Sequence, residues 1–225
     1  MEDFSIALDG CIGSYGVLVI GHLRFNPFFG ETEKAPPRGN PITCTSTFIK
    51  GREKDGSDFF LICDPSLREK PEDSYYELNR RTGFRPSDVT HCYITHSHYD
   101  HQAGVNYYPN AKWCAHPEVA AILKSSEHID GTRIIGVEGE FLPGITDVSL
   151  PGHTLSLHGL AFMDGAYKVL IASDSVMTSG HFIAETGMFE EDADMARRTL
   201  RRVKRDFDLI VPGHDNAIIN IKPGK

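Results

Sequence analysis

The sequence predicts an α/β protein in which sheets pack together and helices cover them on the outside. Apolar, β-branched runs of strand length recur along the whole chain. Helical segments lie between some of these runs, but strands and helices do not alternate strictly. With 225 residues, of which 40% are hydrophobic and 24% charged, the chain can bury a core without disulfide bonds. We therefore expect a single domain spanning residues 1–225.

Eight apolar runs have the length and composition of strands. Several are continuous rather than alternating, which indicates strands that are buried on both faces. The runs are Tyr15–Ile20, Thr43–Ile49, Phe59–Cys63, Val89–Thr95, Val148–Leu150, Leu160–Met163, Val169–Ala172 and Leu209–Val211.

Three segments carry the start and stop signals of helices. Pro71–Arg81 opens with proline and acidic residues and is followed by Gly83, while Pro117–Lys124 has proline in its first turn. In Asp192–Phe207, four apolar residues form one stripe with the spacing i, i+4, i+7 and i+11. These residues are Ala196, Leu200, Val203 and Phe207.

The charge balance argues against a nucleic-acid partner. The formal net charge is -8, whereas nucleic-acid-binding proteins usually present a basic surface. Basic residues are densest in Arg197–Arg205, where we interpret them as the solvated face of the predicted helix. A small-molecule substrate is therefore the expected partner.

The remaining composition predicts a cytoplasmic protein. The start, Met1–Phe4, lacks the regions of a secretory signal, and no apolar run approaches the ~18 residues needed to cross a membrane. No C-x-x-C pair occurs, so we expect reduced cysteines buried in strands. The oligomeric state is left open. The cysteines are Cys11, Cys44, Cys63, Cys92 and Cys114.

The segment Gly30–Pro41 has the polar, Pro- and Gly-rich composition of a loop. A mobile flap beside a site and a plain surface connection both agree with this composition. The sequence leaves the role of the loop open.

The segment from Tyr93 to His101 is the most informative one. An apolar strand runs directly into the pattern H-x-H-x-D-H, which contains His96, His98, Asp100 and His101. In an extended chain, residues i and i+2 point to the same side, so His96 and His98 can converge on one ion. Asp100 can cap the helix that follows while it presents its carboxylate. Imidazole and carboxylate ligands suit zinc, and also iron or manganese.

Three further polar residues follow apolar strands. His153 stands in the turn Pro-Gly-His-Thr, Asp174 ends the run Leu-Ile-Ala-Ser-Asp, and His214 stands in Pro-Gly-His-Asp. Each alone could be a turn residue that is hydrogen-bonded to the backbone. Polar residues at four strand ends are better explained by one shared site.

These motifs, in this order and spacing, resemble those of the metallo-β-lactamase superfamily. Asp64, which directly follows the run Phe59–Cys63, is similar to the early strand-ending aspartate of that family. The resemblance covers about residues 58–216. It implies the four-layer αβ/βα sandwich of the family.

The resemblance also implies a site with two divalent metal ions, most simply zinc. His96, His98 and His153 would bind one ion, and Asp100, His101 and His214 the other. Asp174 would bridge them, while Asp64 would support a ligand from behind. Two such ions lower the pKa of a shared water and supply hydroxide near neutral pH. Asp100 could carry a proton to the leaving group.

Departures from the family narrow the expected reaction. Asp174 at the bridging position indicates the glyoxalase II, lactonase and phosphodiesterase branches rather than true β-lactamases. Acyl-homoserine lactonases typically have a tyrosine shortly after this aspartate, whereas here Ser175–Thr178 follows without a tyrosine, which argues against that activity. Because the sequence continues only briefly after His214, we expect it to lack the helical substrate domain of glyoxalase II.

We therefore expect hydrolysis of a small ester, thioester or lactone. A phosphodiesterase or nuclease with the same metals, a mononuclear iron oxygenase, and a scaffold that only binds are the alternatives. Two further residues are candidates for substrate contact. His181 lies in the segment after Asp174, and Tyr99 stands between two predicted ligands.

Overall fold

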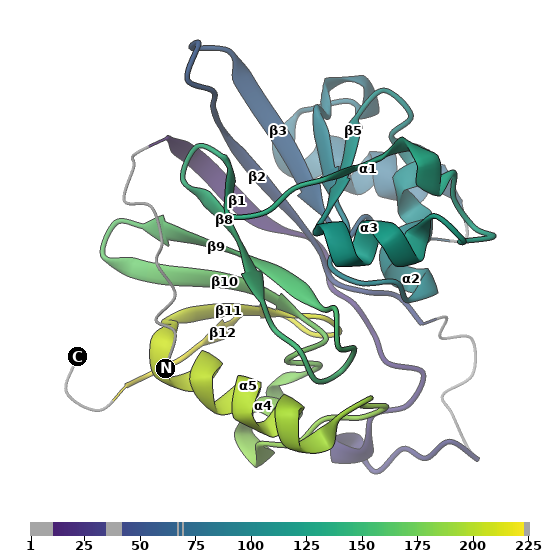
Figure 1. Ribbon diagram of the computed structural model, residues 1–225, viewed down its shortest axis with the longest axis vertical. Helices are drawn as coiled ribbons and strands as arrows, with labels where there is room; N and C mark the ends of the chain where they lie inside the picture. Colours follow the sequence, from purple (N-terminus) through teal and green to yellow (C-terminus); the bar gives the residue numbers. More distant parts are fainter. Residues whose placement is uncertain (1–10, 35–41, 67, 69, 223–225) are drawn as a thin grey trace.

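The computed structural model describes residues 11–34, 42–66, 68 and 70–222. Within this part of the chain, two six-stranded sheets face each other and the helices lie on their outer faces (Figure 1). The layers are therefore helix, sheet, sheet and helix. This arrangement confirms the predicted αβ/βα sandwich.

The first sheet has the strand order β1-β2-β3-β4-β5-β6. Its first three strands pair antiparallel, and β3 to β6 pair parallel. Parallel neighbours end at the same edge of a sheet, so the residues after β3, β4 and β5 meet there. The strands are β1 (Ile12–Val19), β2 (Ser46–Arg52), β3 (Asp58–Cys63), β4 (His91–Tyr93), β5 (Lys112–Ala115) and β6 (Ile134–Gly136).

The second sheet has the order β12-β11-β10-β9-β8-β7. Only the β10 and β11 pair is parallel among its described strands. That one parallel pair brings the residues after β10 and β11 to the same edge. The strands are β7 (Glu140–Leu142), β8 (Ile145–Ser149), β9 (His158–Asp164), β10 (Tyr167–Ser173), β11 (Leu209–Pro212) and β12 (Ile218–Ile219).

The helices begin and end at residues with a clear local cause. Gly83 ends α1 with φ 74°, a left-handed conformation that glycine adopts without strain. Asp192 begins α5, because its side chain accepts a hydrogen bond from the Met195 N–H at 2.8 Å. The helices are α1 (Pro71–Thr82), α2 (Tyr99–Gln102), α3 (Pro117–Leu123), α4 (Ser179–Ala184) and α5 (Ala193–Asp206).

Strand β3 shows how one continuous apolar run serves two cores. Phe59 and Leu61 pack between the two sheets, together with residues of β9, β10 and β11. Phe60 and Ile62 point to the other face, where they pack against α1 and α3. A third core lies between the second sheet and helices α4 and α5. Because both faces are covered, the strand cannot show polar alternation.

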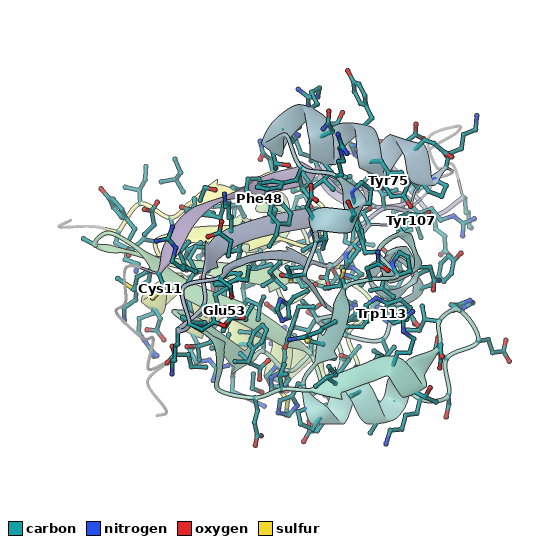
Figure 2. The ribbon with its side chains drawn as sticks, turned by 90° about the horizontal axis from the view of Figure 1, so that it is seen from above. Cys11, Phe48, Glu53, Tyr75, Tyr107 and Trp113 are labelled. Carbon is teal, nitrogen blue, oxygen red and sulfur yellow. The ribbon has the colours of Figure 1, made fainter. Side chains whose placement is uncertain are left out.

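Aromatic residues fill the layer between the first sheet and α1. Figure 2 labels Tyr75 of α1 and Tyr107, whose ring centroids lie 6.4 Å apart. The Tyr75 hydroxyl donates to the Tyr107 carbonyl at 3.0 Å. Phe48 stacks on Phe60 at 5.7 Å between centroids. Tyr75 and Phe48 both pack against the core that joins Leu78 of α1 to Phe60 of the sheet.

The structure departs from the sequence-based expectations in a few places. All eight predicted strands and three predicted helices form, with bounds that differ by a few residues. Strands β5, β6, β7 and β12 were not predicted, because two to four residues are too short for a periodic pattern. None of the helices among the described residues is long and apolar enough to cross a membrane.

The cysteine prediction is partly wrong. All five cysteines are free, and Cys63, Cys92 and Cys114 are buried on the adjacent strands β3, β4 and β5. Cys44, however, is buried outside the strands, and Cys11 is partly exposed and precedes β1. A cysteine behaves as a small apolar side chain, which a buried loop accommodates as well as a strand does. The expected burial of Cys44 therefore did not imply that it lies in a strand.

Candidate metal centre

The candidate site forms where strands of both sheets end. His96 follows β4, Asp174 follows β10 and His214 follows β11, while His153 lies in the turn between β8 and β9. All four side chains are buried. The seven predicted ligands fall into two groups, and within each group the candidate ligand atoms lie within 4.8 Å of one another.

The first group contains His96, His98, His153 and Asp174. His98 Nδ1 lies 3.0 Å from His96 Nε2 and 3.0 Å from His153 Nε2. Three imidazole nitrogens at this spacing are typical of ligands that share one ion. The i, i+2 relationship in the extended segment thus brings His96 and His98 together as predicted.

The second group contains Asp100, His101 and His214. Asp100 Oδ2 lies 3.7 Å from both His101 Nε2 and His214 Nε2. The predicted helix cap at Asp100 is wrong. Helix α2 begins at Tyr99 with His98 as its N-cap, and Asp100 lies in the first turn. His98 has the extended backbone of a cap residue, which leaves the Asp100 carboxylate free to face the site.

Asp174 reaches both groups. Its Oδ1 lies 3.2 Å from His101 Nε2, while its Oδ2 lies 3.3 Å from His214 Nε2 and 3.3 Å from His153 Nε2. A carboxylate that lies within 3.2–3.3 Å of imidazoles from both groups has the geometry of a bridging ligand. No other described carboxylate lies this close to both groups.

Unpaired polar atoms support the presence of cations at this site. Asp100 Oδ2, His101 Nε2 and Asp174 Oδ1 are buried and have no hydrogen-bond partner. A buried polar atom without a partner costs about 1–3 kcal/mol, so three at one place require a binding partner. Imidazole nitrogens and carboxylate oxygens are ligands for divalent transition metals, and the residues therefore fit such ions.

Asp64 fixes the orientation of His101 from behind. His101 Nδ1 lies 2.8 Å from Asp64 Oδ2. The same carboxylate accepts hydrogen bonds from the Thr95 N–H at 2.9 Å, the Thr95 hydroxyl at 2.8 Å and the Ser173 hydroxyl at 2.9 Å. With His101 Nδ1 protonated towards Asp64, the lone pair of Nε2 points into the site. This geometry agrees with the supporting role expected for Asp64.

Backbone carbonyls orient two other histidines. His214 Nδ1 lies 3.1 Å from the Thr43 carbonyl oxygen, and His153 Nδ1 lies 3.2 Å from the Met188 carbonyl oxygen. Each carbonyl accepts an Nδ1–H and leaves Nε2 as the ligand atom. Sequence reasoning missed both carbonyls, because a backbone acceptor in a loop carries no residue-type signal.

Burial and charge set the protonation of the site. Burial, together with the neighbouring His101, holds the pKa of His96 well below its ordinary value, so this imidazole is neutral and able to bind a cation. Burial alone would raise the pKa of Asp174. His214 and His101 outweigh burial and hold the pKa of this carboxyl well below its usual range.

A cavity of about 410 Å³ opens onto both groups. Its volume is in the range of small-molecule sites. Tyr99, which is half-exposed and packs edge-on against His128, forms part of the wall. The cavity is lined by Leu23, Arg24, Phe25, Glu33, Ile42, His98, Tyr99, Asp100, His153, Asp174, Met177, Phe189 and His214.

Comparison with known families agrees with this geometry. The sequence model of the metallo-beta-lactamase superfamily matches residues 39–214, most of the chain and both ligand groups. The chain belongs to the metallo-beta-lactamase superfamily. The predicted family membership is thereby confirmed.

Curated relatives within the superfamily are N-acyl homoserine lactonases. The chain is 25% identical over 164 residues to one from Bacillus sp, and 26% identical over 164 residues to one from Bacillus thuringiensis. Each match covers 67% of this chain and 65% of the relative. The chain thus spans slightly less than two thirds of the length of these relatives.

Solved structures of the superfamily share the fold. A metallo-beta-lactamase protein from Thermotoga maritima is 21% identical, with a TM-score of 0.65 over 93% of this chain and 99% of that protein. A dizinc quorum-quenching lactonase is 14% identical, with a TM-score of 0.63 over 80% of this chain and 77% of that protein. At these identities the likeness concerns the fold alone.

His181 occupies a different environment from Tyr99. It is 1% exposed, its Nδ1 lies 2.7 Å from the Thr178 hydroxyl, and the Phe28 ring packs edge-on against it. Burial lowers the pKa of His181 to about 4. It is not among the residues that line the cavity. Its contact with substrate stays a prediction.

A third group of metal-ligating residue types lies away from the site. His116, Asp147 and His158 come together, with His158 Nδ1 2.9 Å from Asp147 Oδ2 and the Tyr93 hydroxyl donating to the same carboxylate. The rings of His116 and His158 stack face to face at 3.6 Å. Parallel stacked rings cannot both direct an in-plane lone pair at one ion. This group is a buried hydrogen-bond network that no local sequence pattern indicated.

Proposed function

We propose that this protein hydrolyses a lactone or ester bond of a small molecule with the help of two divalent metal ions. The observation that carries the proposal is the position of Asp174, whose two oxygens lie 3.2–3.3 Å from imidazoles of both ligand groups. A single-metal site would not require a carboxylate between two such groups. We further propose that residues 1–225 act as one domain in the cytoplasm.

Each ligand group would hold one ion, with Asp174 shared between them. The ligands of the first ion are His96, His98 and His153, and those of the second are Asp100, His101 and His214. Two divalent ions held by these residues would supply a hydroxide nucleophile near neutral pH and a Lewis acid for the carbonyl oxygen. Zinc suits this mixture of imidazole and carboxylate best, while iron and manganese accept the same ligands.

Asp100 is the residue we propose for proton transfer. Its Oδ2 is buried and without a hydrogen-bond partner, and its side chain lines the cavity. A carboxylate in this place can accept a proton from the attacking water and deliver it to the leaving oxygen.

The walls of the cavity favour a small substrate with an apolar part. Leu23, Phe25, Met177 and Phe189 line it, and Phe25 and Phe189 pack edge-on at 6.3 Å. The lactonase names of the curated relatives support a lactone as substrate. Met177 follows Asp174 by three positions, in the segment where the acyl-homoserine lactonases typically carry a tyrosine, and its side chain lines the cavity there.

A nuclease is the less favoured alternative because four of the six basic residues of α5 form ion pairs with acidic residues. Arg197 pairs with Asp194 at 3.1 Å, and both Arg201 and Lys204 pair with Glu185, at 3.2 and 3.0 Å. A nucleic-acid groove needs cations that are free to meet successive phosphates. These ion pairs support the interpretation of the basic residues in Arg197–Arg205 as the solvated face of α5.

Metal analysis combined with a substrate screen tests the proposal. We expect about two metal equivalents per chain after expression in zinc-supplemented medium, and metal-dependent hydrolysis of lactones or esters. The screen includes thioester, β-lactam and phosphodiester substrates. One equivalent of iron that added zinc does not change, together with oxygen-dependent turnover, would instead establish a mononuclear oxygenase.

A further inference from the structure

The cavity wall contains a cationic residue, Arg24, whose backbone segment is hydrogen-bonded to a residue that contacts the candidate metal centre. Leu23, Arg24 and Phe25 follow one another in sequence, and all three line the cavity. An isolated β-bridge between His22 and Thr43 anchors this segment, with N–H to carbonyl distances of 2.7 and 3.2 Å. The same Thr43 carbonyl holds His214. The Arg24 side chain therefore extends from a point that is fixed relative to the ligands.

The guanidinium of Arg24 is not neutralised within the described part of the chain. Its side chain is exposed, and no carboxylate among residues 11–34, 42–66, 68 and 70–222 forms an ion pair with it. The basic residues of α5 differ in this respect, because most of them pair with neighbouring acids. A protein of net charge -8 thus exposes an unpaired cation at the cavity that leads to its metal ligands.

We propose that Arg24 selects substrates that carry a carboxylate in addition to the bond that is cleaved. This inference rests on the hydrolytic function proposed above and specifies the class of lactone or ester. A guanidinium offers a planar fork of N–H donors that matches a carboxylate with two parallel hydrogen bonds. The apolar part of such a substrate would pack against Leu23, Phe25 and Phe189.

Glu33 should affect anionic substrates in the opposite direction to Arg24. It also lines the cavity and is exposed. Its carboxylate repels an anionic substrate, so that the selectivity reflects the balance between Arg24 and Glu33. Replacing Arg24 removes the positive charge that opposes Glu33, and replacing Glu33 removes the negative charge that opposes Arg24.

The test compares two lactones of the same shape. One is 5-oxotetrahydrofuran-2-carboxylate and the other is its neutral carboxamide, both assayed with the zinc-loaded full chain. In the native protein we expect a lower KM for the carboxylate. Arg24→Gln should raise that KM about fivefold, the effect of about 1 kcal/mol for a solvent-exposed ion pair, with a smaller effect on kcat.

Three matched variants separate charge from structure. Arg24→Lys should restore most of the preference for the carboxylate, and Glu33→Gln should strengthen it. Arg198→Gln, which removes an exposed arginine on the outer face of α5, should change neither KM. Added salt should raise the KM of the carboxylate more than that of the carboxamide, because it screens the exposed guanidinium.

Binding of a substrate analogue distinguishes failure of this inference from failure of the proposed function. Calorimetry measures the affinity of 3-oxocyclopentanecarboxylate and of its carboxamide, which cannot be hydrolysed. A preference for the carboxylate that Arg24→Gln abolishes supports the inference even when neither lactone is hydrolysed. Equal affinities, or equal changes for both ligands in Arg24→Gln, overturn it even when both lactones are hydrolysed.

Discussion

Ser173 and Asp64 end strands of different sheets, and the Ser173 hydroxyl donates to Asp64 Oδ2 across 2.9 Å. Both residues have left-handed backbones, with φ 48° for Ser173 and φ 47° for Asp64. This conformation costs roughly 1 kcal/mol or more for a residue other than glycine. The left-handed conformation turns the backbone sharply at the end of β3 and of β10. These turns direct the side chains of Asp64 and Asp174 towards the site.

Asp64→Asn should weaken metal binding without unfolding the protein. An amide nitrogen in place of Oδ2 would face the Ser173 and Thr95 hydroxyls and the Nδ1–H of His101, so His101 would lose its orientation. We expect metal affinity to fall about 10–100-fold, as measured by competition with a chromophoric chelator. Asp58→Asn, an exposed change at the start of β3, is the control. Equal affinities in both variants would remove Asp64 from the supporting role.

Asp174→Ala should abolish most activity while the fold persists. Among the described residues, this carboxylate is the one that lies close to imidazoles of both groups, so its loss would remove the bridge that we propose between the two ions. We expect kcat to fall at least about 100-fold and the metal content to fall below two equivalents. Circular dichroism checks the fold. Native turnover with two metals retained would mean that another group bridges them.

Gly213→Ala should inactivate the enzyme through Asp174. A Cβ at position 213 would stand 1.8 Å from Asp174 Oδ1 and would force the carboxylate to move. A displacement of about 1 Å at a catalytic centre can reduce kcat about 100-fold. Gly13→Ala is the matched control, because the nearest atom to its Cβ would be 3.7 Å away. If the two variants were equally active, the position of Asp174 would not matter for turnover.

His91 should destabilise the fold in acid. Burial lowers its pKa to about 4, whereas the pKa in the unfolded chain is near 6.5. Its contribution to stability is therefore complete above pH 6.5 and is lost as the pH falls towards 4, because the unfolded chain binds the proton first.

His91→Gln isolates this contribution. Between pH 6.5 and 5 the native metal-free protein should lose about 1.5 kcal/mol of unfolding free energy more than the variant. Urea denaturation at the two pH values measures the difference. A variant that loses the same free energy as the native protein would assign the acid sensitivity to other groups.

Single-stranded oligonucleotides should bind weakly. Four of the six cations of α5 are paired with Glu185, Asp194 or Asp206, so we expect few counterions to be released. Fluorescence anisotropy near physiological salt should give a Kd weaker than about 10 μM. The metal-free protein is used so that cleavage does not interfere. Micromolar binding with a steep salt dependence, and metal-dependent cleavage, would make the protein a nuclease.

The positions of four candidate ligands could be predicted from the sequence because each of the four follows an apolar run. His96, His153, Asp174 and His214 stand at strand ends, and packed sheets gather such ends at one edge. The local i, i+2 relation then paired His98 with His96. Residues 35–41 of the loop Gly30–Pro41 lie outside the described residues, but Glu33 within the loop lines the cavity.

Other features had no local signal. The Met188 carbonyl that holds His153 depends on a loop conformation, with Phe189 at φ 57°, that no residue pattern encodes. The network of Tyr93, Asp147 and His158 joins three strands that are separated in sequence. Such contacts follow from the pairing of strands and the packing of the two sheets, which composition and periodicity do not determine.

Because β3 packs on both faces, the number of residues in this strand determines the direction in which Asp64 points. Side chains alternate between the two cores along Asp58–Cys63, and the next residue, Asp64, emerges on the side where His101 lies. Inserting one residue would exchange the two faces and turn Asp64 away. Substitutions that keep the alternation can therefore accumulate in β3 during evolution, whereas insertions and deletions are confined to the loops on either side of it.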